Sequence, residues 1–346
     1  MTHRGLLIGC GFFAGNHMNG WADAEGAEIV AVCDLDESKA QAMADRFGIG
    51  RVFTDAEQAL GEMRPDFVDV ATTVPSHRKL VELAFAHGAA TICQKPFAET
   101  LTDARAMVQA GEDAGKPLFV HENFRWELPL IALRDALAEG AIGDPAFARI
   151  SFRHRYDVYA GQPYLAEVEQ FALMDVGLHL FDVVRFLFGD SADLHCRTQS
   201  MKPGIAGEDM FLATLRQKSG AVVSVDCSFY SVEVPDPFPQ TMIRVEGPEG
   251  TLDLTAGYTL NLHKDGKLDS RSVEPGVPVW GEKPWHAVQD SVAAFERHVV
   301  RVLDGKEDPQ PSGAHNLATL AMALAAYRSA ETGETIVLDA FAEQAR

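Results

Sequence analysis

A lysine and an aspartate–histidine pair are the residues of this chain best suited to acid–base chemistry. Lys95 lies in the sequence Gln94-Lys95-Pro96, directly after the short apolar run Thr91–Cys93, where a strand is expected to end. A lysine ammonium held there can donate a hydrogen bond to a reacting oxygen and polarise it. Asp175 and His179 are one helical turn apart, so the carboxylate can orient the imidazole and raise its basicity.

The stretch around this pair is apolar on nearly every side, which predicts a buried helix over residues 175–188. Asp175, His179 and Asp182 nevertheless recur on one face of that helix. A buried polar stripe is costly unless its groups are paired or line a wet pocket. Two interpretations stay open: a reactive pair, or satisfied polar groups of the core, with Asp182 in a local ion pair with Arg185.

A glycine-rich turn near the N-terminus has the pattern Gly9-x-Gly11-x-x-Ala14. Gly9 permits a tight turn, Gly11 lets the backbone approach a pyrophosphate, and Ala14 keeps the following helix close to the sheet. The N–H groups at the start of that helix can bind phosphates. Phe12 and Phe13, inside the turn, belong to the same expected dinucleotide site.

An aspartate follows the second expected strand. Asp34 comes directly after Ala27–Cys33 and about twenty residues after Ala14, where a carboxylate can accept hydrogen bonds from an adenosine ribose. No arginine stands beside Asp34 to receive a 2′-phosphate, so the sequence favours NAD over NADP. The alternative, a turn that binds no nucleotide, is disfavoured because the pattern lies between a strand and a helix.

Polar residues also follow the next strands of the predicted sheet. Thr72, Ser76 and His77 come after the fourth strand, and Gln94 and Lys95 come after the fifth. Because ligands of open α/β sheets lie outside the carboxyl ends of the strands, all five are expected to contact the cofactor. For His77, a place over the cofactor or in solvent is favoured over a catalytic role.

Four further polar residues are candidates for ligand contacts. Asn123 and Arg125 follow the sixth strand, where either side chain could reach the nicotinamide or substrate hydroxyls. The alternative for Arg125 is an ion pair with a neighbouring glutamate. Arg153, at the end of a later strand, and Gln162, in the loop beyond it, are weaker candidates for binding substrate.

The order of the elements indicates two domains. Apolar runs alternate with helical spacing in residues 1–124, which predicts a Rossmann-type, doubly wound parallel sheet covered on both faces. Strands in residues 125–346 alternate polar and apolar side chains, which predicts an α+β domain with an open, mostly antiparallel sheet. The fold class is therefore α/β. The last long helical run, residues 314–332, could pack back against the first domain.

The composition limits the class of protein. The chain has 346 residues, 47% of them hydrophobic and 23% charged, as expected of two globular domains. A net charge of −20 disfavours nucleic acid and membranes as partners, and no apolar run reaches about 18 residues. Five cysteines without a CxxC pair predict reduced thiols of a cytoplasmic protein, and no metal site is expected.

Taken together, these motifs resemble the Gfo/Idh/MocA oxidoreductases over essentially the whole chain, down to the hairpin sequence 246–251. The resemblance implies hydride exchange between NAD and a carbinol of a sugar, inositol or related polyol, in a homodimer or homotetramer. It also implies that Lys95 is the catalytic lysine and that Asp175 and His179 are the two polar residues of the family's helix, with His179 as the base. One departure is Gln94, where the family usually has glutamate, so one source of support for the ammonium of Lys95 is missing.

Within the family, the stretches 11–21 and 171–177 resemble the D-apiose dehydrogenase branch. That likeness implies oxidation of a branched aldose at its anomeric carbon to a lactone. Two alternatives are kept. One is a polyol or inositol dehydrogenase that forms a ketone, and the other is a dinucleotide-binding regulator without turnover, which the presence of Lys95, Asp175 and His179 disfavours.

Overall fold

The computed structural model describes residues 2–344, which fall into two compact units. Unit 1 comprises the chain up to Asn123 together with Ser291–Leu320, and unit 2 comprises Phe124–Asp290 and the segment that begins at Ala321. Unit 1 therefore includes residues 291–320, although the sequence predicts that they belong to the second domain. The reason is that α9 (His286–Leu303) and α10 (Gly313–Thr332) each contribute residues to both units.

Unit 1 is built on a six-stranded parallel sheet with the order β3-β2-β1-β4-β5-β6. Strands β4 and β5 are buried at every position, as expected when helices cover both faces. The strand order reverses between β1 and β4, which is the place where ligands bind such sheets. The strands are β1 (His3–Ile8), β2 (Ala27–Cys33), β3 (Val52–Phe53), β4 (Phe67–Val70), β5 (Ala90–Gln94) and β6 (Leu118–His121).

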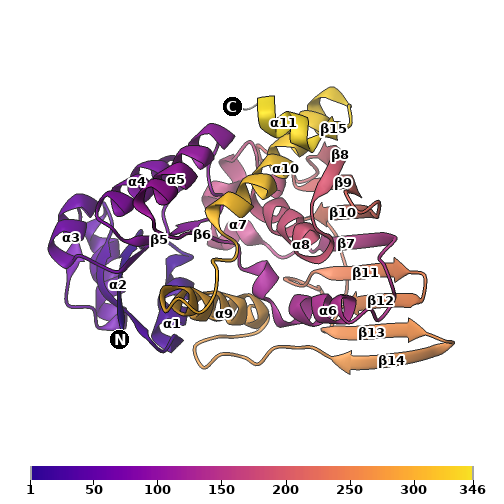
Figure 1. The fold of residues 1–346 in the computed structure, drawn as a ribbon, viewed down its shortest axis with the longest axis horizontal. Coiled ribbons are helices and arrows are strands. Elements are labelled where there is room, and N and C mark those ends of the chain that lie inside the picture. The colour runs from indigo at the N-terminus through magenta and orange to yellow at the C-terminus, as the bar shows by residue number, and fades with distance from the viewer. Residues whose placement is uncertain (1, 345–346) are drawn as a thin grey trace. The chain divides into compact units, whose positions relative to one another are not determined.

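Helices connect these strands, and several begin at a capping side chain. Asp36, Asp55 and Thr100 each accept a hydrogen bond from a backbone N–H of the first helical turn that follows. Figure 1 shows α4 and α5 side by side, and the two helices pack on each other. The helices wholly within unit 1 are α1 (Ala14–Asp23), α2 (Glu37–Phe47), α3 (Ala56–Met63), α4 (His77–Ala86), α5 (Leu101–Ala114) and the 3₁₀ turn Val74–Ser76.

Unit 2 contains a nine-stranded sheet with the order β14-β13-β12-β11-β7-β10-β9-β8-β15, visible as a ladder in Figure 1. All neighbouring pairs are antiparallel except β7 with β10, so the predicted fold class is confirmed. The strands are β7 (Phe147–Arg153), β8 (Ser191–Gln199), β9 (Met210–Gln217), β10 (Val222–Ser228), β11 (Met242–Gly247), β12 (Gly250–Thr255), β13 (Thr259–Lys264), β14 (Lys267–Ser272) and β15 (Ile336–Val337).

In the part of the chain that the structure describes, helices pack against one face of this sheet. α6 packs on β12 and β13, and α8 packs on β10. Along β9 the side chains alternate between buried and exposed, so every second residue points to the uncovered face. The remaining helices of unit 2 are short, apart from its share of α9 and α10. The helical elements of unit 2 are 3₁₀ turns at Phe124–Trp126 and Pro163–Glu167, a π turn at Leu173–Gly177, α6 (Leu128–Ala138), α7 (Val158–Gly161), α8 (Leu178–Phe188) and α11 (Leu338–Gln344).

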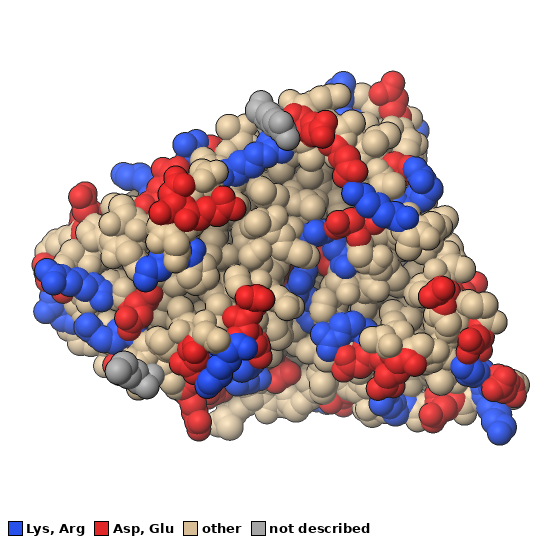
Figure 2. Space-filling model, viewed as in Figure 1, with Lys and Arg blue, Asp and Glu red and all other residues tan. Residues whose placement is uncertain are grey.

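Charge is mixed over the surface. Figure 2 shows acidic and basic side chains interspersed on the displayed face, so the excess of acidic residues does not form a single-sign patch there. Among residues 2–344, no helix combines the length and the apolar character needed to cross a membrane.

A buried acid at the start of α6 gives unit 2 a pH-dependent stability. Burial, reinforced by Asp290, raises the pKa of Glu127 from its ordinary 4.5 to about 8. The unfolded chain releases this proton near the ordinary pKa, whereas the folded chain holds it to about pH 8. The free energy of unfolding should therefore fall as pH rises between those two values.

Glu127→Gln should remove this pH-dependent loss, because a glutamine carries no proton to release. The Tm of Glu127→Gln relative to the unchanged protein should rise from pH 5 to pH 8.5 by several degrees. Glu139→Gln, at the exposed C-terminal end of the same helix, is the control and should show a constant Tm difference. A constant difference for Glu127→Gln as well would show that Glu127 does not titrate in this range.

Candidate functional site

The glycine turn of unit 1 has the shape that a dinucleotide site needs. Gly9 has φ +98°, and a Cβ there would lie 2.5 Å from the carbonyl oxygen of Ala71, so the turn accepts only glycine. A Cβ on Gly11 would meet nothing within 4 Å, which leaves open space over the turn. The residue before helix α1, Phe13, provides no capping side chain, and the first turn of the helix contains no acidic residue. Its N–H groups and positive dipole end therefore suit an anionic phosphate.

Asp34 is held beside this turn by the backbone. Its carboxylate accepts hydrogen bonds from the N–H of Cys10 (2.7 Å) and from the N–H of Asp36 (2.9 Å). The side chain is only half-buried, so the carboxylate can also accept hydrogen bonds from a ribose. Next to the turn and to Asp34, the side chains of Phe12 and Leu35 are 60% and 94% exposed. The donors and acceptors of this region fit a dinucleotide.

His77 lies inside unit 1 rather than in solvent. Its side chain is fully buried, with Nε2 3.1 Å from the carbonyl oxygen of Thr72 and Nδ1 3.3 Å from that of Phe97. Burial lowers the pKa of His77, so the imidazole is neutral and one ring nitrogen at a time donates. The ring thus joins the loop after β4 to the loop after β5. Ser76 donates its hydroxyl to Thr72 Oγ1 at 2.7 Å, in the first of these loops.

Lys95 follows β5 directly, as the sequence predicts. Its side chain is half-buried, and its backbone N–H donates to Gln94 Oε1 at 2.6 Å. Asn123, after β6, is buried and donates its amide to Ser291 Oγ of α9 at 2.8 Å. The structure therefore collects the glycine turn, Asp34, Ser76 and Lys95 at the carboxyl edge of the parallel sheet, as expected for consecutive parallel strands.

In unit 2, Asp175 and His179 lie where a π turn passes into α8. The expected helix begins earlier and differently, because residues Leu173–Gly177 form a π turn before the α-helix starts at Leu178. Such turns re-aim side chains and are frequent at functional sites. Asp175 is the one half-buried residue in a run of buried ones. His179 is 5% exposed and stacks on Phe124, with ring centroids 4.1 Å apart.

The carboxylate of Asp175 acts on other groups of unit 2. It contributes to raising the pKa of Tyr159 to about 12, after burial, Asp209 and Asp157. It also opposes the effect of burial, which lowers the pKa of His154 to about 4. Asp175 therefore lies near an aromatic residue, Tyr159, and a buried imidazole, His154.

Arg125 forms a different contact from those predicted. Its guanidinium donates to both carboxylate oxygens of Asp182, at 2.6 and 2.5 Å, and both side chains are buried. Arg185 forms an ion pair with Asp190 at 3.0 Å. A bidentate fork from the segment before α6 thus binds Asp182, as the interpretation of a satisfied polar group in the core requires. Asp182 and Arg125 fix α8 in place.

Arg153 points away from His179. Phe152 packs on Phe124, which stacks on His179, and successive residues of β7 point to opposite faces of the sheet. Arg153 donates to Asp226 Oδ1 at 2.6 Å on the other face. The geometry thus contradicts a shared substrate contact for Arg153 and His179. Gln162 is half-buried and accepts a hydrogen bond from the hydroxyl of Tyr164 at 3.0 Å.

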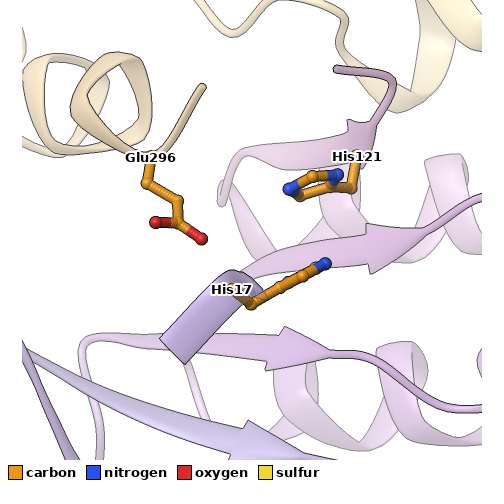
Figure 3. Close-up of side chains that lie close together, drawn as sticks. All are labelled: His17, His121 and Glu296. Carbon is orange, nitrogen blue, oxygen red and sulfur yellow. The ribbon is translucent and has the colours of Figure 1, made fainter. Parts of the chain in front are cut away.

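One buried cluster of unit 1 was not predicted. His17 of α1, His121 of β6 and Glu296 of α9 offer ligand atoms within 4.8 Å of one another, and Figure 3 shows the Glu296 carboxylate directed toward the two rings. By distance alone these three could hold a cation. However, His17 already uses both ring nitrogens, toward Asp69 and Gln94, at 2.8 Å each. Burial raises the pKa of Glu296 well above its usual range, which disfavours the carboxylate form that a cation would bind.

Comparison with known proteins agrees with this geometry. A family model described as an oxidoreductase family with an NAD-binding Rossmann fold matches residues 4–122, and the GFO/IDH/MocA C-terminal domain matches residues 130–253. The D-apiose dehydrogenase of Paraburkholderia graminis is 49% identical over 99% of this chain and 91% of its own length. That of Rhizobium rhizogenes is 45% identical over 97% of this chain and 98% of its own.

A solved structure covers the same length. An oxidoreductase from Agrobacterium radiobacter, solved in complex with NAD⁺, L-tartaric acid and magnesium, superposes with a TM-score of 0.97 at 45% identity. The match covers 98% of this chain and 99% of that one. These matches confirm both the resemblance drawn from the motifs and the prediction of NAD as the cofactor. The chain belongs to the GFO/IDH/MocA family of oxidoreductases and carries its NAD-binding Rossmann fold.

Proposed function

We propose that this chain is an NAD-dependent dehydrogenase that oxidises an aldose, D-apiose foremost, at the anomeric carbon to a lactone. The observation that carries the proposal is the presence of both halves of a dehydrogenase. Unit 1 has a dinucleotide turn with Lys95 at the same sheet edge, and unit 2 has a half-buried Asp175 beside His179. The two D-apiose dehydrogenases that align over nearly the whole chain support the substrate.

The residues divide the chemistry as follows. Conversion of a cyclic hemiacetal to a lactone removes one hydride from the anomeric carbon and one proton from its hydroxyl. NAD, when bound, supplies the hydride acceptor. We propose that His179 accepts the proton, that Asp175 orients its ring, and that the Lys95 ammonium donates a hydrogen bond to the reacting oxygen. One base suffices, because only one proton leaves the substrate.

The other predicted contacts separate into two groups. We propose that the turn from Gly9 to Phe13, Asp34, Thr72 and Ser76 contact NAD, and that Gln162 contacts the sugar. Four further predicted residues already use their side chains inside one unit and act by holding its segments in place. They are His77, Gln94, Asn123 and Arg125.

A substrate panel tests the proposal. The purified protein is mixed with NAD and with D-apiose, other aldoses, or myo-inositol, and NADH formation is followed by absorbance. We expect turnover with an aldose and, by NMR, a lactone that opens to the acid. A ketone formed from inositol would instead establish the polyol alternative. Tight NAD binding without turnover on any member would overturn the dehydrogenase proposal.

Cofactor choice should depend on Asp34. In Asp34→Ala, the ribose loses a charged acceptor, so the affinity for NAD should fall about 10- to 100-fold. The affinity for NADP should fall far less, because the carboxylate repels the 2′-phosphate of NADP in the unchanged protein. The Kd values for both cofactors, measured by titration calorimetry, give the ratio that decides this. If the substitution acts only by removing the hydrogen bond from Cys10 N–H and disordering the turn, the binding of both cofactors should weaken equally. That outcome would count against a role for Asp34 in cofactor specificity.

We further propose that the chain forms a homodimer or homotetramer through the uncovered face of the nine-stranded sheet. On this face the side chains of Leu212, Val222 and Phe147 are 50%, 45% and 38% exposed. They lie among the ion pairs of Arg149 and Arg153 with Asp226. Apolar side chains ringed by paired charges are typical of an interface between copies. The molar mass from light scattering should be that of a dimer or a larger oligomer. Leu212→Glu should shift the measured mass toward that of a monomer. A monomeric parent protein would contradict the proposal.

A cytoplasmic location is proposed from the thiols. All five cysteines are buried and unpaired, which suits a reducing compartment. Fractionation of the producing cells should recover the protein with cytoplasmic markers. Recovery from an oxidising compartment would contradict this location.

A further inference from the structure

The side chain of Gln94 has a fixed orientation. Its Oε1 lies 2.6 Å from the backbone nitrogen of Lys95, and its Nε2 lies 2.8 Å from Nε2 of His17. A backbone N–H can only donate, so the atom facing Lys95 must be the amide oxygen. The amide nitrogen therefore faces His17 and donates to it.

This orientation determines the tautomer of His17. Because Nε2 of His17 accepts a hydrogen bond from Gln94, it carries no proton in the neutral ring. The proton is on Nδ1, which donates to Oδ2 of Asp69 at 2.8 Å. The same oxygen accepts a second hydrogen bond from the indole N–H of Trp21, also at 2.8 Å. The donor and the acceptor are therefore known for every hydrogen bond of the network that runs from Lys95 to Trp21.

The network is buried throughout. The exposed fractions are 0% for His17 and Asp69, 2% for Trp21 and 8% for Gln94. It connects α1, β4 and the end of β5, so it ties the start of the Lys95 segment to the helix that follows the glycine turn. The ring of His121 on β6 stacks on His17 at 4.1 Å and restricts its movement.

We propose that His17 is a positioning residue for Lys95 and acts through Gln94. The inference rests on the proposed function, since it matters only if the place of the Lys95 ammonium sets the rate. A neutral imidazole with one nitrogen as acceptor holds the glutamine amide, and the amide holds the first backbone N–H of the lysine segment. The pair of Gln94 and His17 thus does without the carboxylate that the family usually places before its lysine.

A glutamate at position 94 would change the charge of this network. Its carboxylate could still accept from Lys95 N–H, but its second oxygen would face the lone pair of His17 Nε2. A hydrogen bond between this oxygen and His17 Nε2 would form only if His17 took up a second proton. The titratable groups facing His17 are Asp69, His121 and Glu296, and of these Asp69 bonds to it directly. Gln94→Glu should therefore convert His17 to an imidazolium.

The cluster of His17, His121 and Glu296 could be read instead as a metal site, and the hydrogen bonds argue against that. A cation would need a lone pair on His17, yet Nε2 is used by Gln94 and Nδ1 carries the proton shared with Asp69. Binding a metal would release Gln94 and with it the Lys95 backbone.

Activity measurements test the positioning role. His17→Phe and Gln94→Met keep the buried volume but remove the hydrogen bond, so each should lower kcat about 10- to 100-fold with KM for NAD within a few-fold. The double variant should be no worse than either single one, because both break the same contact. His298→Phe is the matched control. It also removes a buried imidazole of unit 1 that makes two hydrogen bonds, and it should lower Tm but not kcat.

An NMR readout is independent of turnover. In ¹⁵N-histidine-labelled protein, His17, identified by its loss in His17→Phe, should show one protonated nitrogen, Nδ1, and Gln94→Glu should show two. Absence of sugar turnover in the parent protein would remove the proposed function but leave this tautomer test intact.

Three results would overturn the positioning role. One is full kcat in folded Gln94→Met, and another is additive losses in the double variant. The third is stoichiometric binding of added Zn²⁺ to the parent protein that both His17→Phe and Glu296→Gln abolish, because the cluster would then be a metal site.

Discussion

Lys95→Ala should lower kcat for the sugar about 10²- to 10³-fold while leaving the affinity for NAD within a few-fold of the unchanged protein. The ammonium is proposed to donate to the reacting oxygen, where negative charge develops as the proton leaves. An interaction of that kind is stronger in the transition state than in the bound substrate, so its loss appears in kcat. Lys95 is half-buried at the end of β5, which allows it to meet a ligand without full desolvation.

The measurement is the steady-state rate of NADH formation with the best aldose of the panel, together with a calorimetric Kd for NAD. Lys79→Ala is the matched control, because Lys79 is an exposed lysine of unit 1 on α4 with no proposed role. Lys95→Arg separates charge from geometry, since a guanidinium keeps the charge but not the compact ammonium. It should retain part of the rate. A Lys95→Ala protein with full kcat would show that the lysine only supports the loop.

The alternating fold of unit 1 was accessible from sequence because buried strands carry a strong signal. Residues Ala27–Cys33 were predicted as a strand and form β2 with the same bounds. Thr91–Cys93, the apolar run at which a strand was expected to end, lie inside β5. Each of these segments is apolar throughout or regularly spaced, so local sequence alone indicates its structure.

What the sequence could not provide were contacts between distant segments. Arg125 and Asp182 are 57 positions apart in the sequence. No local sequence pattern favours this ion pair over one between Asp182 and Arg185, which lie on the same helix. Glu296 is an acidic residue in a helical run that resembles any amphipathic surface helix, yet it is fully buried beside His17. The boundaries of the two units could not be predicted for the same reason, because residues 291–320 belong to unit 1 through packing and not through a local sequence pattern.

One signal within the sequence did point to the unpredicted network. Gln94 departs from the family's usual glutamate, and the departure was interpreted only as a charge lost beside Lys95. The structure shows the compensating feature, because the amide that replaces the carboxylate meets a neutral His17. A substitution next to a catalytic position is therefore best examined together with the polar residues of the preceding βα turn and its helix. On α1 the buried polar residues that join this network are His17 and Trp21.

His179→Ala should lower kcat about 10²- to 10⁴-fold, the range expected when a general base is removed. Asp175→Asn should cost less, because it leaves the imidazole in place and changes only its orientation. The measurement is kcat and KM of each protein for the best aldose of the panel, with NAD at saturation.

Packing allows a sharper form of this experiment. His179 is buried and stacks face to face on Phe124, so alanine leaves a cavity the shape of an imidazole ring against that phenylalanine. Added imidazole should enter the cavity and restore part of kcat in a saturable manner. His263→Ala, which removes an exposed histidine of β13, is the control and should neither lose activity nor respond to imidazole. A His179→Ala protein with low Tm, full kcat and no response to imidazole would make His179 a packing residue, and the base would have to be found elsewhere.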